Sequence, residues 1–332
     1  MGHRSSEDFV ARLRHRAAAE RKRIAFPESS DPRVLQAVEA LHAEGIVSPV
    51  LIRGPGIAAS RLPAGVPVID TRDSEQTEPL VASLHDRRRG RRVSDAEAEA
   101  LARDPLIFAN DLVRHGEVDG CVAGCVYTTA EVMRAALWLV GPMEGVRTVS
   151  SAFYMVTPPF RGDQSEVLTF TDCAVVRYPT AEQLADIGIA AAQDRRRIVG
   201  DTPVVAFLSF STTGSAEGES VSRVREAVAL VRSRVPELAV DGELQGDAAL
   251  VAAVAHRKAP ASSVAGNANI LVFPALDSGN ISYKLVERIG RSAAIGPILQ
   301  GLARPCNDLS RGASADDIIN VAAVTALQAH PF

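Results

Sequence analysis

The sequence alternates short β-forming runs with amphipathic helical segments, and this alternation constrains the fold more than any other feature. An apolar run at 23–26 is followed by a helix, for which Asp31 is a suitable N-cap, Pro32 a suitable first residue and Gly45 a suitable end. The apolar run 47–52 then completes a β-α-β unit, whose two strands must be parallel. The alternation predicts an α/β chain with largely parallel sheets covered by helices on both faces. Further strands are expected at 66–70, 118–123, 204–210 and 270–273, and further helices at 96–102, 105–114, 180–196, 218–234, 247–256, 278–289, 314–328 and from Thr128 onward.

Two β-like runs in the middle of the chain break this alternation. Residues 146–156 and 166–171 are joined by a proline turn and a polar stretch that leaves no room for a helix. They predict an antiparallel hairpin or two neighbouring strands. With 332 residues, the chain is long enough for two domains of about 150 residues each.

Composition and charge exclude several classes of function. The formal net charge of −4 excludes nucleic-acid binding by a global basic field. No apolar run approaches the roughly 18 residues of a membrane span and the N-terminus lacks an apolar signal segment, so we expect no membrane association and a cytoplasmic location. Four scattered cysteines are too few for a disulfide framework.

Motif searches exclude the commonest metal and nucleotide sites. The chain has no GxxxxGK[ST] loop, no GxGxxG after a strand, no HExxH pair and no GxSxG elbow. Cys121 and Cys125 lack a second Cys or His pair at a suitable spacing for zinc. We therefore predict neither a metal nor a bound cofactor.

Two polar loops at predicted strand or helix ends are candidates for anion binding. The first, 305–317, leads into the last helix and carries Arg311 beside Gly312, but Ser314 and Asp317 also form an acceptable capping box. The residues alone leave capping and catalysis equally open. The second loop, 209–215, follows an apolar strand, and its Ser211 and Thr212 are candidates for substrate binding.

The basic run at 87–92 has a functional and a structural interpretation. It would suit a nucleotide, a nucleic acid or an acidic partner, but it has no interleaved aromatic residues for base stacking. A solvated charged face is the simpler interpretation.

Taken together, collinear motifs across nearly the whole chain resemble those of the phosphate acetyltransferase (phosphotransacetylase) family. The matching stretches are 119–124, 148–151, 170–175, 179–184, 208–216, 242–245, 277–284, 294–301 and 307–312. The resemblance implies reversible acetyl transfer between coenzyme A and inorganic phosphate, by direct attack and without an acyl-enzyme. Acetyl-CoA or CoA and phosphate or acetyl phosphate are then substrates, and no cofactor is implied.

The resemblance also implies an architecture. It consists of two α/β/α domains flanking a cleft, similar to the isocitrate and isopropylmalate dehydrogenases, and usually a homodimer. We place the first domain at 1–146, completed by 297–332 with the last helix, and the second at 147–296.

Site residues follow from the same resemblance, position by position. The family's serine-arginine pair falls on Ser310 and Arg311, and its catalytic aspartate on Asp317. Two arginines of the family that contact phosphate fall on Arg134 and, with a less regular surrounding pattern, on Arg88. A carboxylate suits removal of the thiol proton of CoA, whose pKa is ~8.5, and the arginines suit the leaving phosphate.

Two alternatives remain open at the level of sequence. Departures from the family pattern at Tyr127, Thr213 and Asn267 would accommodate a longer acyl group such as butyryl. A non-catalytic acetyl-CoA-binding regulatory module is the second alternative.

Overall fold

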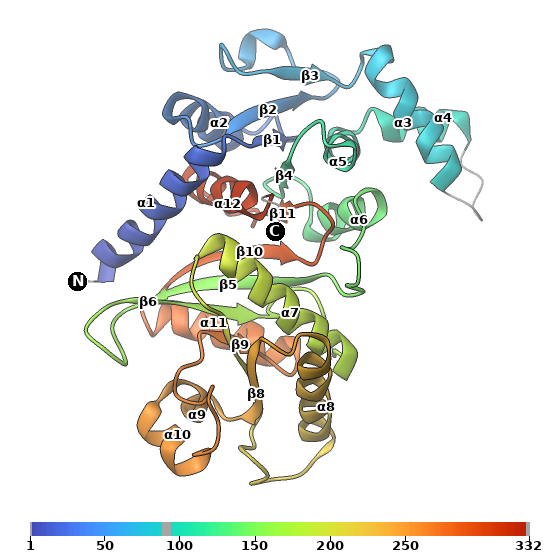
Figure 1. Ribbon diagram of the computed structural model, residues 1–332. Coiled ribbons are helices and arrows are strands. Elements are labelled where there is room, and N and C mark those ends of the chain that lie inside the picture. Colours follow the sequence, from blue (N-terminus) through green and yellow to red (C-terminus); the bar gives the residue numbers. More distant parts are fainter. Residues whose placement is uncertain (1, 88–93, 330–332) are drawn as a thin grey trace. The chain divides into compact units, whose positions relative to one another are not determined.

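The computed structural model of the protein describes residues 2–87 and 94–329, which form two compact units (Figure 1). The first unit comprises Leu13–Gly141 and Leu302–Phe332, and the second comprises Met1–Arg12 and Pro142–Gly301. The units therefore divide at 12/13, 141/142 and 301/302. The last two divisions lie a few residues from the predicted boundaries at 146/147 and 296/297, whereas residues 1–12, predicted in the first domain, are counted with the second unit. The later return point has a simple cause, because strand β10 (Ala293–Gln300) pairs with β5 (Ser150–Thr157) up to its last residue.

The first unit is built on a five-stranded sheet in which every pairing is parallel. Its strand order is β11-β4-β1-β2-β3, so the last strand of the chain lies at one edge, beside β4. The strands are β1 (Arg23–Phe26), β2 (Ser48–Arg53), β3 (Val68–Asp70), β4 (Gly120–Ala123) and β11 (Cys306–Asp308). Three neighbouring strands, β1, β4 and β11, consequently end at the same edge of the sheet.

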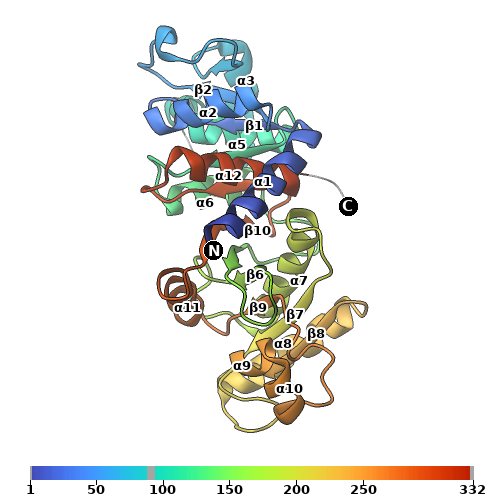
Figure 2. The ribbon, with the colours of Figure 1, turned by 90° about the vertical axis from the view of Figure 1, so that its left-hand side faces the viewer.

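Helices cover both faces of this sheet. The helical segments of the unit are α1 (Gly2–Glu20, its first turns counted with the second unit), α2 (Pro32–Glu44), η1 (Ala59–Arg61), α3 (Ser74–Arg87), α4 (Asp95–Ala102), α5 (Pro105–His115), α6 (Thr129–Leu139) and α12 (Ala315–Gln328). Helices α2 and α12 pack together on one face, seen toward the viewer in Figure 2, and α5 and α6 pack together on the other. The predicted caps at Asp31 and Gly45 are confirmed, and the helix predicted from Thr128 onward is α6, with Thr128 as its N-cap.

The second unit contains a mixed six-stranded sheet of order β10-β5-β6-β9-β7-β8. Its further strands are β6 (Glu166–Thr171), β7 (Val204–Leu208), β8 (Ala239–Leu244) and β9 (Ile270–Val272). Strands β5 and β6 pair antiparallel, which confirms the predicted hairpin, and β10 extends this antiparallel part. The remaining pairings are parallel.

The second unit has a hydrophobic core on each face of its sheet. Along β7, Val205 and Phe207 face α7 (Ala181–Ile198) and α8 (Glu219–Arg234), whereas Ala206 and Leu208 face the other core. That other face is covered by α9 (Gly246–Leu250), α10 (Ala252–Lys258) and α11 (Leu276–Arg288). Because successive strand residues point to opposite faces, strands covered on both sides are apolar throughout.

Comparison with the predictions identifies what the sequence pattern missed. The α/β class with parallel sheets is confirmed, but α1, α3, β8, β10 and β11 were not anticipated. The segment 247–256 was predicted as one helix, which is wrong, because the chain breaks at Val251 between α9 and α10. The segment from Pro305 was predicted as a loop, yet it contains the buried strand β11. None of the described helices is both long and apolar enough to cross a membrane.

Packing at Gly188 in α7 generates a first prediction. Alanine is normally better than glycine inside a helix by about 1 kcal/mol, but a Cβ atom at Gly188 would lie 2.6 Å from Cζ of Phe207. Gly188→Ala is therefore expected to lower the free energy of unfolding by about 1–3 kcal/mol, measured by chemical denaturation. Gly246→Ala is the matched control, because a Cβ there meets nothing within 4 Å. Equal stability of the two variants would contradict this packing argument.

Candidate active site

The ends of three parallel strands bring the candidate site together in the first unit. Residues 27–31 follow β1, residues 124–128 follow β4, and residues 309–314 follow β11. Since these strands are neighbours in a parallel sheet, the three loops emerge at one edge. That edge is where α/β sheets usually bind ligands.

A buried carboxylate at this edge organises the loop after β4. The two carboxylate oxygens of Glu28 accept hydrogen bonds from the backbone N–H groups of residues 124–127, four successive amides, over 2.7–3.1 Å. The side chain of Glu28 is buried. Such a concave arrangement of amides suits an anion, and here the protein supplies the anion itself. The loop that precedes α6 thus takes its shape from an acid in the loop after the neighbouring strand β1.

Close approach then connects this loop to the end of β11. The N–H of Leu309 donates to the carbonyl of Ala123 over 2.8 Å. Gly124 has φ +122°, and a Cβ atom there would lie 2.5 Å from the backbone of Leu309 and 2.6 Å from Oδ1 of Asp308. Only glycine fits this position.

Asp308 is a second buried carboxyl group at the same edge. Its Oδ2 accepts a hydrogen bond of 2.6 Å from the hydroxyl of Thr129, the first residue of α6, while its buried Oδ1 has no partner among the described residues. Burial raises the pKa of Asp308 to about 6, and the negative charge of Glu28 contributes in the same direction.

The loop from Ser310 to Ser314 carries the predicted catalytic residues. Ser310 is exposed, and its hydroxyl oxygen accepts from the N–H of Gly312 over 3.3 Å. Asp317 is also exposed, and its Oδ2 accepts from the N–H and the hydroxyl of Ser314 over 2.9 and 2.8 Å. The capping box is therefore present. Oδ1 of Asp317 receives no hydrogen bond from the described part of the chain, so capping leaves one oxygen open.

The guanidinium groups of Arg134 and Arg311 lie in the same neighbourhood and are uncommitted. Both residues are exposed, and neither side chain donates a hydrogen bond to any residue of 2–87 or 94–329. Hydrogen bonds from Thr128 lower the pKa of Glu131, and the charges of Arg134 and Arg311 lower it further. Both guanidinium groups consequently lie near the first turn of α6. The structure brings together Ser310, Arg311 and Arg134 within one unit.

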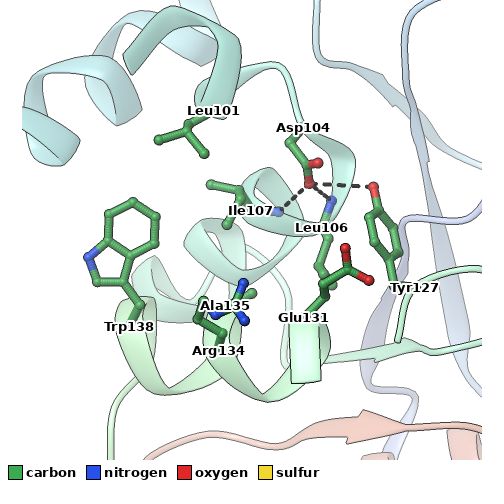
Figure 3. A pocket seen from close by; sticks show the side chains of 9 residues that line it. All are labelled: Leu101, Asp104, Leu106, Ile107, Tyr127, Glu131, Arg134, Ala135 and Trp138. Atoms are coloured by element: carbon green, nitrogen blue, oxygen red, sulfur yellow. Dashed lines mark hydrogen bonds between the residues drawn. The ribbon is translucent and has the colours of Figure 1, made fainter. Parts of the chain in front are cut away.

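A cavity of about 480 Å³ opens beside Arg134. Figure 3 shows Trp138 and Tyr127 on opposite sides of it, with Arg134 and Glu131 from α6 between them. The lining is completed by Leu101, Asp104, Leu106, Ile107 and Ala135. The Tyr127 hydroxyl donates to Oδ1 of Asp104 over 3.4 Å, and burial raises the pKa of that hydroxyl. The pocket combines aromatic walls with one uncommitted cation.

The predicted substrate-binding residues Ser211 and Thr212 lie in the second unit and are buried. The Ser211 hydroxyl donates to Oε1 of Glu243 over 2.8 Å, and the Thr212 hydroxyl accepts from the N–H of Gln245 over 2.9 Å. These side chains hold their own loop, and contact with a substrate stays a prediction. Arg88 lies outside the described residues.

Comparisons with known proteins agree with this arrangement. The family described as phosphate acetyl/butaryl transferase matches residues 8–326. The chain belongs to this family. A phosphate acetyltransferase of Acetivibrio thermocellus is 43% identical over 325 residues, 97% of this chain and 98% of the relative. The predicted family and the predicted enzyme class, an acyltransferase, are confirmed.

Solved structures support the same conclusion. A phosphotransacetylase from Streptococcus pyogenes superposes with a TM-score of 0.88 at 38% identity, over 97% of this chain and 98% of that chain. A 4-hydroxythreonine-4-phosphate dehydrogenase from Klebsiella pneumoniae has a TM-score of 0.51 at 17% identity, over 93% of this chain and 100% of that chain, and shares the fold alone.

Sequence reasoning missed the residues that support the site in this family member. No role is predicted for Glu28 from the sequence, and Asp308 is included only within the family motif 307–312. The available signal for Glu28 was an acid two residues beyond a predicted strand, whereas Asp308 ends β11, a strand that the sequence pattern did not predict. No sequence pattern indicates that Trp138 and Leu101 line a pocket, because the pocket forms only where α4, α5 and α6 meet.

The raised pKa of Asp308 generates a pH prediction. Between its ordinary pKa of 3.8 and about 6, the unfolded chain loses the Asp308 proton while the folded protein retains it. The contribution of Asp308 to the free energy of unfolding therefore falls as the pH rises through this window, and it levels off above about pH 6. Relative to wild type, Asp308→Asn is expected to gain about 2 kcal/mol in free energy of unfolding from pH 4 to 6.

Urea unfolding of both proteins at half-unit pH steps measures this difference. The variant Asp163→Asn, at an exposed loop position, serves as the control and is expected to show no such gain. A constant difference between Asp308→Asn and wild type across the window would contradict the prediction.

Proposed function

We propose that this protein is a phosphate acetyltransferase, which reversibly converts acetyl-CoA and phosphate into CoA and acetyl phosphate. The observation that carries the proposal is the pair of uncommitted guanidinium groups, Arg134 and Arg311, beside Ser310 at the carboxyl edge of a parallel sheet. Guanidinium groups bind phosphate with two parallel hydrogen bonds. The names of the relatives support the same activity.

The proposed reaction is a direct attack of the CoA thiol on acetyl phosphate. Asp317 removes the thiol proton, the sulfur forms a bond to the carbonyl carbon, and the carbon–oxygen bond to phosphate breaks. A thiol of pKa ~8.5 is mostly protonated near neutral pH, so a carboxylate base assists the attack. The open Oδ1 of Asp317 supports this role, while Oδ2 holds the helix cap.

Charge develops on the carbonyl oxygen and the departing phosphate during this step. We propose that Arg311 and Arg134 bind this phosphate. The Ser310 hydroxyl is proposed to hydrogen-bond to the carbonyl oxygen or to the thiol. A single donor of this kind commonly contributes ~2.7 to 4 kcal/mol to lowering the barrier. Arg88 is proposed as a further phosphate contact, and the loop of Ser211 and Thr212 as a further substrate contact.

The cavity beside Arg134 suits the reacting end of the substrates. Its aromatic walls, Trp138 and Tyr127, match the apolar acyl group, and Arg134 matches the phosphate that leaves. CoA and phosphate are accordingly proposed as substrates without any resident cofactor.

We further propose that the protein is a cytoplasmic homodimer that pairs through α11. Ile281, Leu285 and Ile289 lie four residues apart along one side of this helix, and each is more than half exposed (57%, 51% and 78%). The opposite side of α11 packs inward through Tyr283, whose ring stacks on Phe153 at 4.0 Å. A twofold axis through Leu285 would place Ile281 of one copy on Ile289 of the other, so the stripe is complementary to a second copy of itself.

A longer acyl group is the second candidate substrate. The family includes butyryl transferases, and this chain departs from the usual pattern at Thr213 and Asn267. Phosphate-dependent release of CoA from acetyl-CoA and from butyryl-CoA, measured with one protein preparation, distinguishes the two. Binding of acetyl-CoA without any phosphate-dependent CoA release would instead favour a regulatory module.

Variants of the catalytic loop test the proposed mechanism. Asp317→Asn keeps an oxygen that can cap α12 but removes the base, and Arg311→Ala removes a phosphate contact. Each is expected to lower kcat by at least about a hundredfold in the CoA-release assay. Ser314→Ala is the matched control, since it weakens the helix cap by about 1 kcal/mol but leaves the carboxylate of Asp317 in place. A near wild-type rate for Asp317→Asn or Arg311→Ala would refute the assigned roles.

A charge in the apolar stripe of α11 tests the dimer. Leu285→Glu is expected to yield a monomer at micromolar concentration by light scattering coupled to size exclusion, because two carboxylates would meet at the twofold axis. Val251→Glu introduces the same charge at a half-exposed apolar residue outside α11 and is expected to remain dimeric. A monomeric wild-type protein, or a dimeric Leu285→Glu variant, would show that α11 is not the interface.

A further inference from the structure

Arg33, at the start of α2, has a guanidinium group with no donor left for a ligand. Its Nε and one Nη2 hydrogen donate to the two carboxylate oxygens of Asp31, over 3.1 and 2.8 Å. The remaining donors bind three backbone carbonyls, those of Arg311 at 2.7 Å, Ala313 at 2.9 Å and Cys125 at 3.2 Å. All five N–H groups are therefore used within the protein. This separates Arg33 from Arg134 and Arg311, whose donors are uncommitted.

These bonds join three segments that are far apart in the sequence. The Cys125 carbonyl belongs to the loop fixed by Glu28, and the N–H of the same residue donates to Oε2 of Glu28 over 3.0 Å. The other two carbonyls flank Gly312 in the loop after β11. Arg33 consequently ties the loop after β11 to a loop that is already held by a buried carboxylate.

Other restraints on the loop after β11 are sparse. Within 310–313, the N–H groups of Gly312 and Ala313 bond to the hydroxyl and carbonyl of Ser310. Among the described residues, the two bonds from Arg33 are the only hydrogen bonds that join 310–313 to another segment. Leu309 on one side and the capped end of α12 on the other restrain only the ends of the loop.

We propose that Arg33 is a positioning residue for acyl transfer. By fixing the carbonyls on both sides of Gly312, it sets the backbone from which Ser310 and Arg311 project and the entry into α12, where Asp317 lies. The inference rests on the proposed function and deepens it, because it assigns how the reacting groups are aligned rather than which groups react. A lysine cannot replace this contact, since an ammonium group has three donors and no planar fork.

Steady-state kinetics and chemical rescue test the proposal. Arg33→Ala is expected to lower kcat by about tenfold to a hundredfold, while KM for CoA and for acetyl phosphate stays within about threefold, since Arg33 aligns the loop without touching substrate. Guanidinium chloride at millimolar concentration is expected to restore part of kcat, and methylammonium is not, because only guanidinium has the fork. Arg33→Lys is expected to show a loss of kcat similar to that of Arg33→Ala, and its kcat is the test if the alanine variant does not fold.

The control variant is Arg53→Ala in β2 of the same unit. Like Arg33, Arg53 is partly buried and pairs with an aspartate, Asp70, but it lies away from the loop after β11. The kcat of Arg53→Ala is therefore expected to remain near wild type even if the melting temperature of the variant changes. A folded Arg33 variant with wild-type kcat would overturn the proposal. A raised KM with unchanged kcat would overturn it as well, by making Arg33 a substrate contact.

Hydrogen exchange separates this inference from the proposed function. Amides of residues 311–314 are expected to exchange faster in Arg33→Ala than in wild type, and this readout does not depend on any activity. An inactive wild-type protein with faster exchange in the variant would refute the acetyltransferase assignment and leave the loop contact in place. Unchanged exchange in the variant would refute the loop contact itself.

Discussion

The carboxylate of Glu28, buried among four backbone amides, is the interaction on which the candidate site depends. It fixes the turn between β4 and α6, and this turn sets where α6 begins and hence where Arg134 lies. The same turn contains Gly124, against which the backbone after β11 packs. An uncompensated buried charge would be costly, but several N–H donors offset the loss of water. One acidic side chain thereby organises loops from two other strands.

The arginines at this edge of the sheet are of two kinds, which differ in whether their guanidinium N–H groups are hydrogen-bonded within the protein. Arg33 has every N–H group bound within the protein, whereas Arg134 and Arg311 have none bound among the described residues. The first kind contributes to loop geometry, and the second is available to an anionic ligand. This distinction explains how a chain with a net charge of −4 can offer a locally cationic site.

The sequence predicted the elements whose signals are local and missed those that depend on distant partners. The cap at Asp31 and the helix starts at Thr128 and Thr180 were predictable because a capping residue and the amide that it binds are neighbours in the sequence. Strand β11 has three residues, and it becomes a strand only by pairing with β4. The contact from Arg33 to Ala313 spans 280 residues and leaves no local trace. The resemblance to the family predicted the catalytic residues, but only the structure shows which contacts hold them in place.

The position of β11 in the chain has a consequence for biosynthesis. In the pairing of β11 with β4, Cys306 lies in register with Cys121, and Pro142–Gly301, the larger part of the second unit, is translated between the two strands. β11, which leads into the loop of Ser310 and Arg311, is therefore synthesised long after its partner strand β4. A nascent chain can complete the second unit while the first still lacks its fifth strand and its last helix. The loop of Ser310 and Arg311 can accordingly take up its place only after β11 has paired with β4, a contact between segments far apart in the sequence.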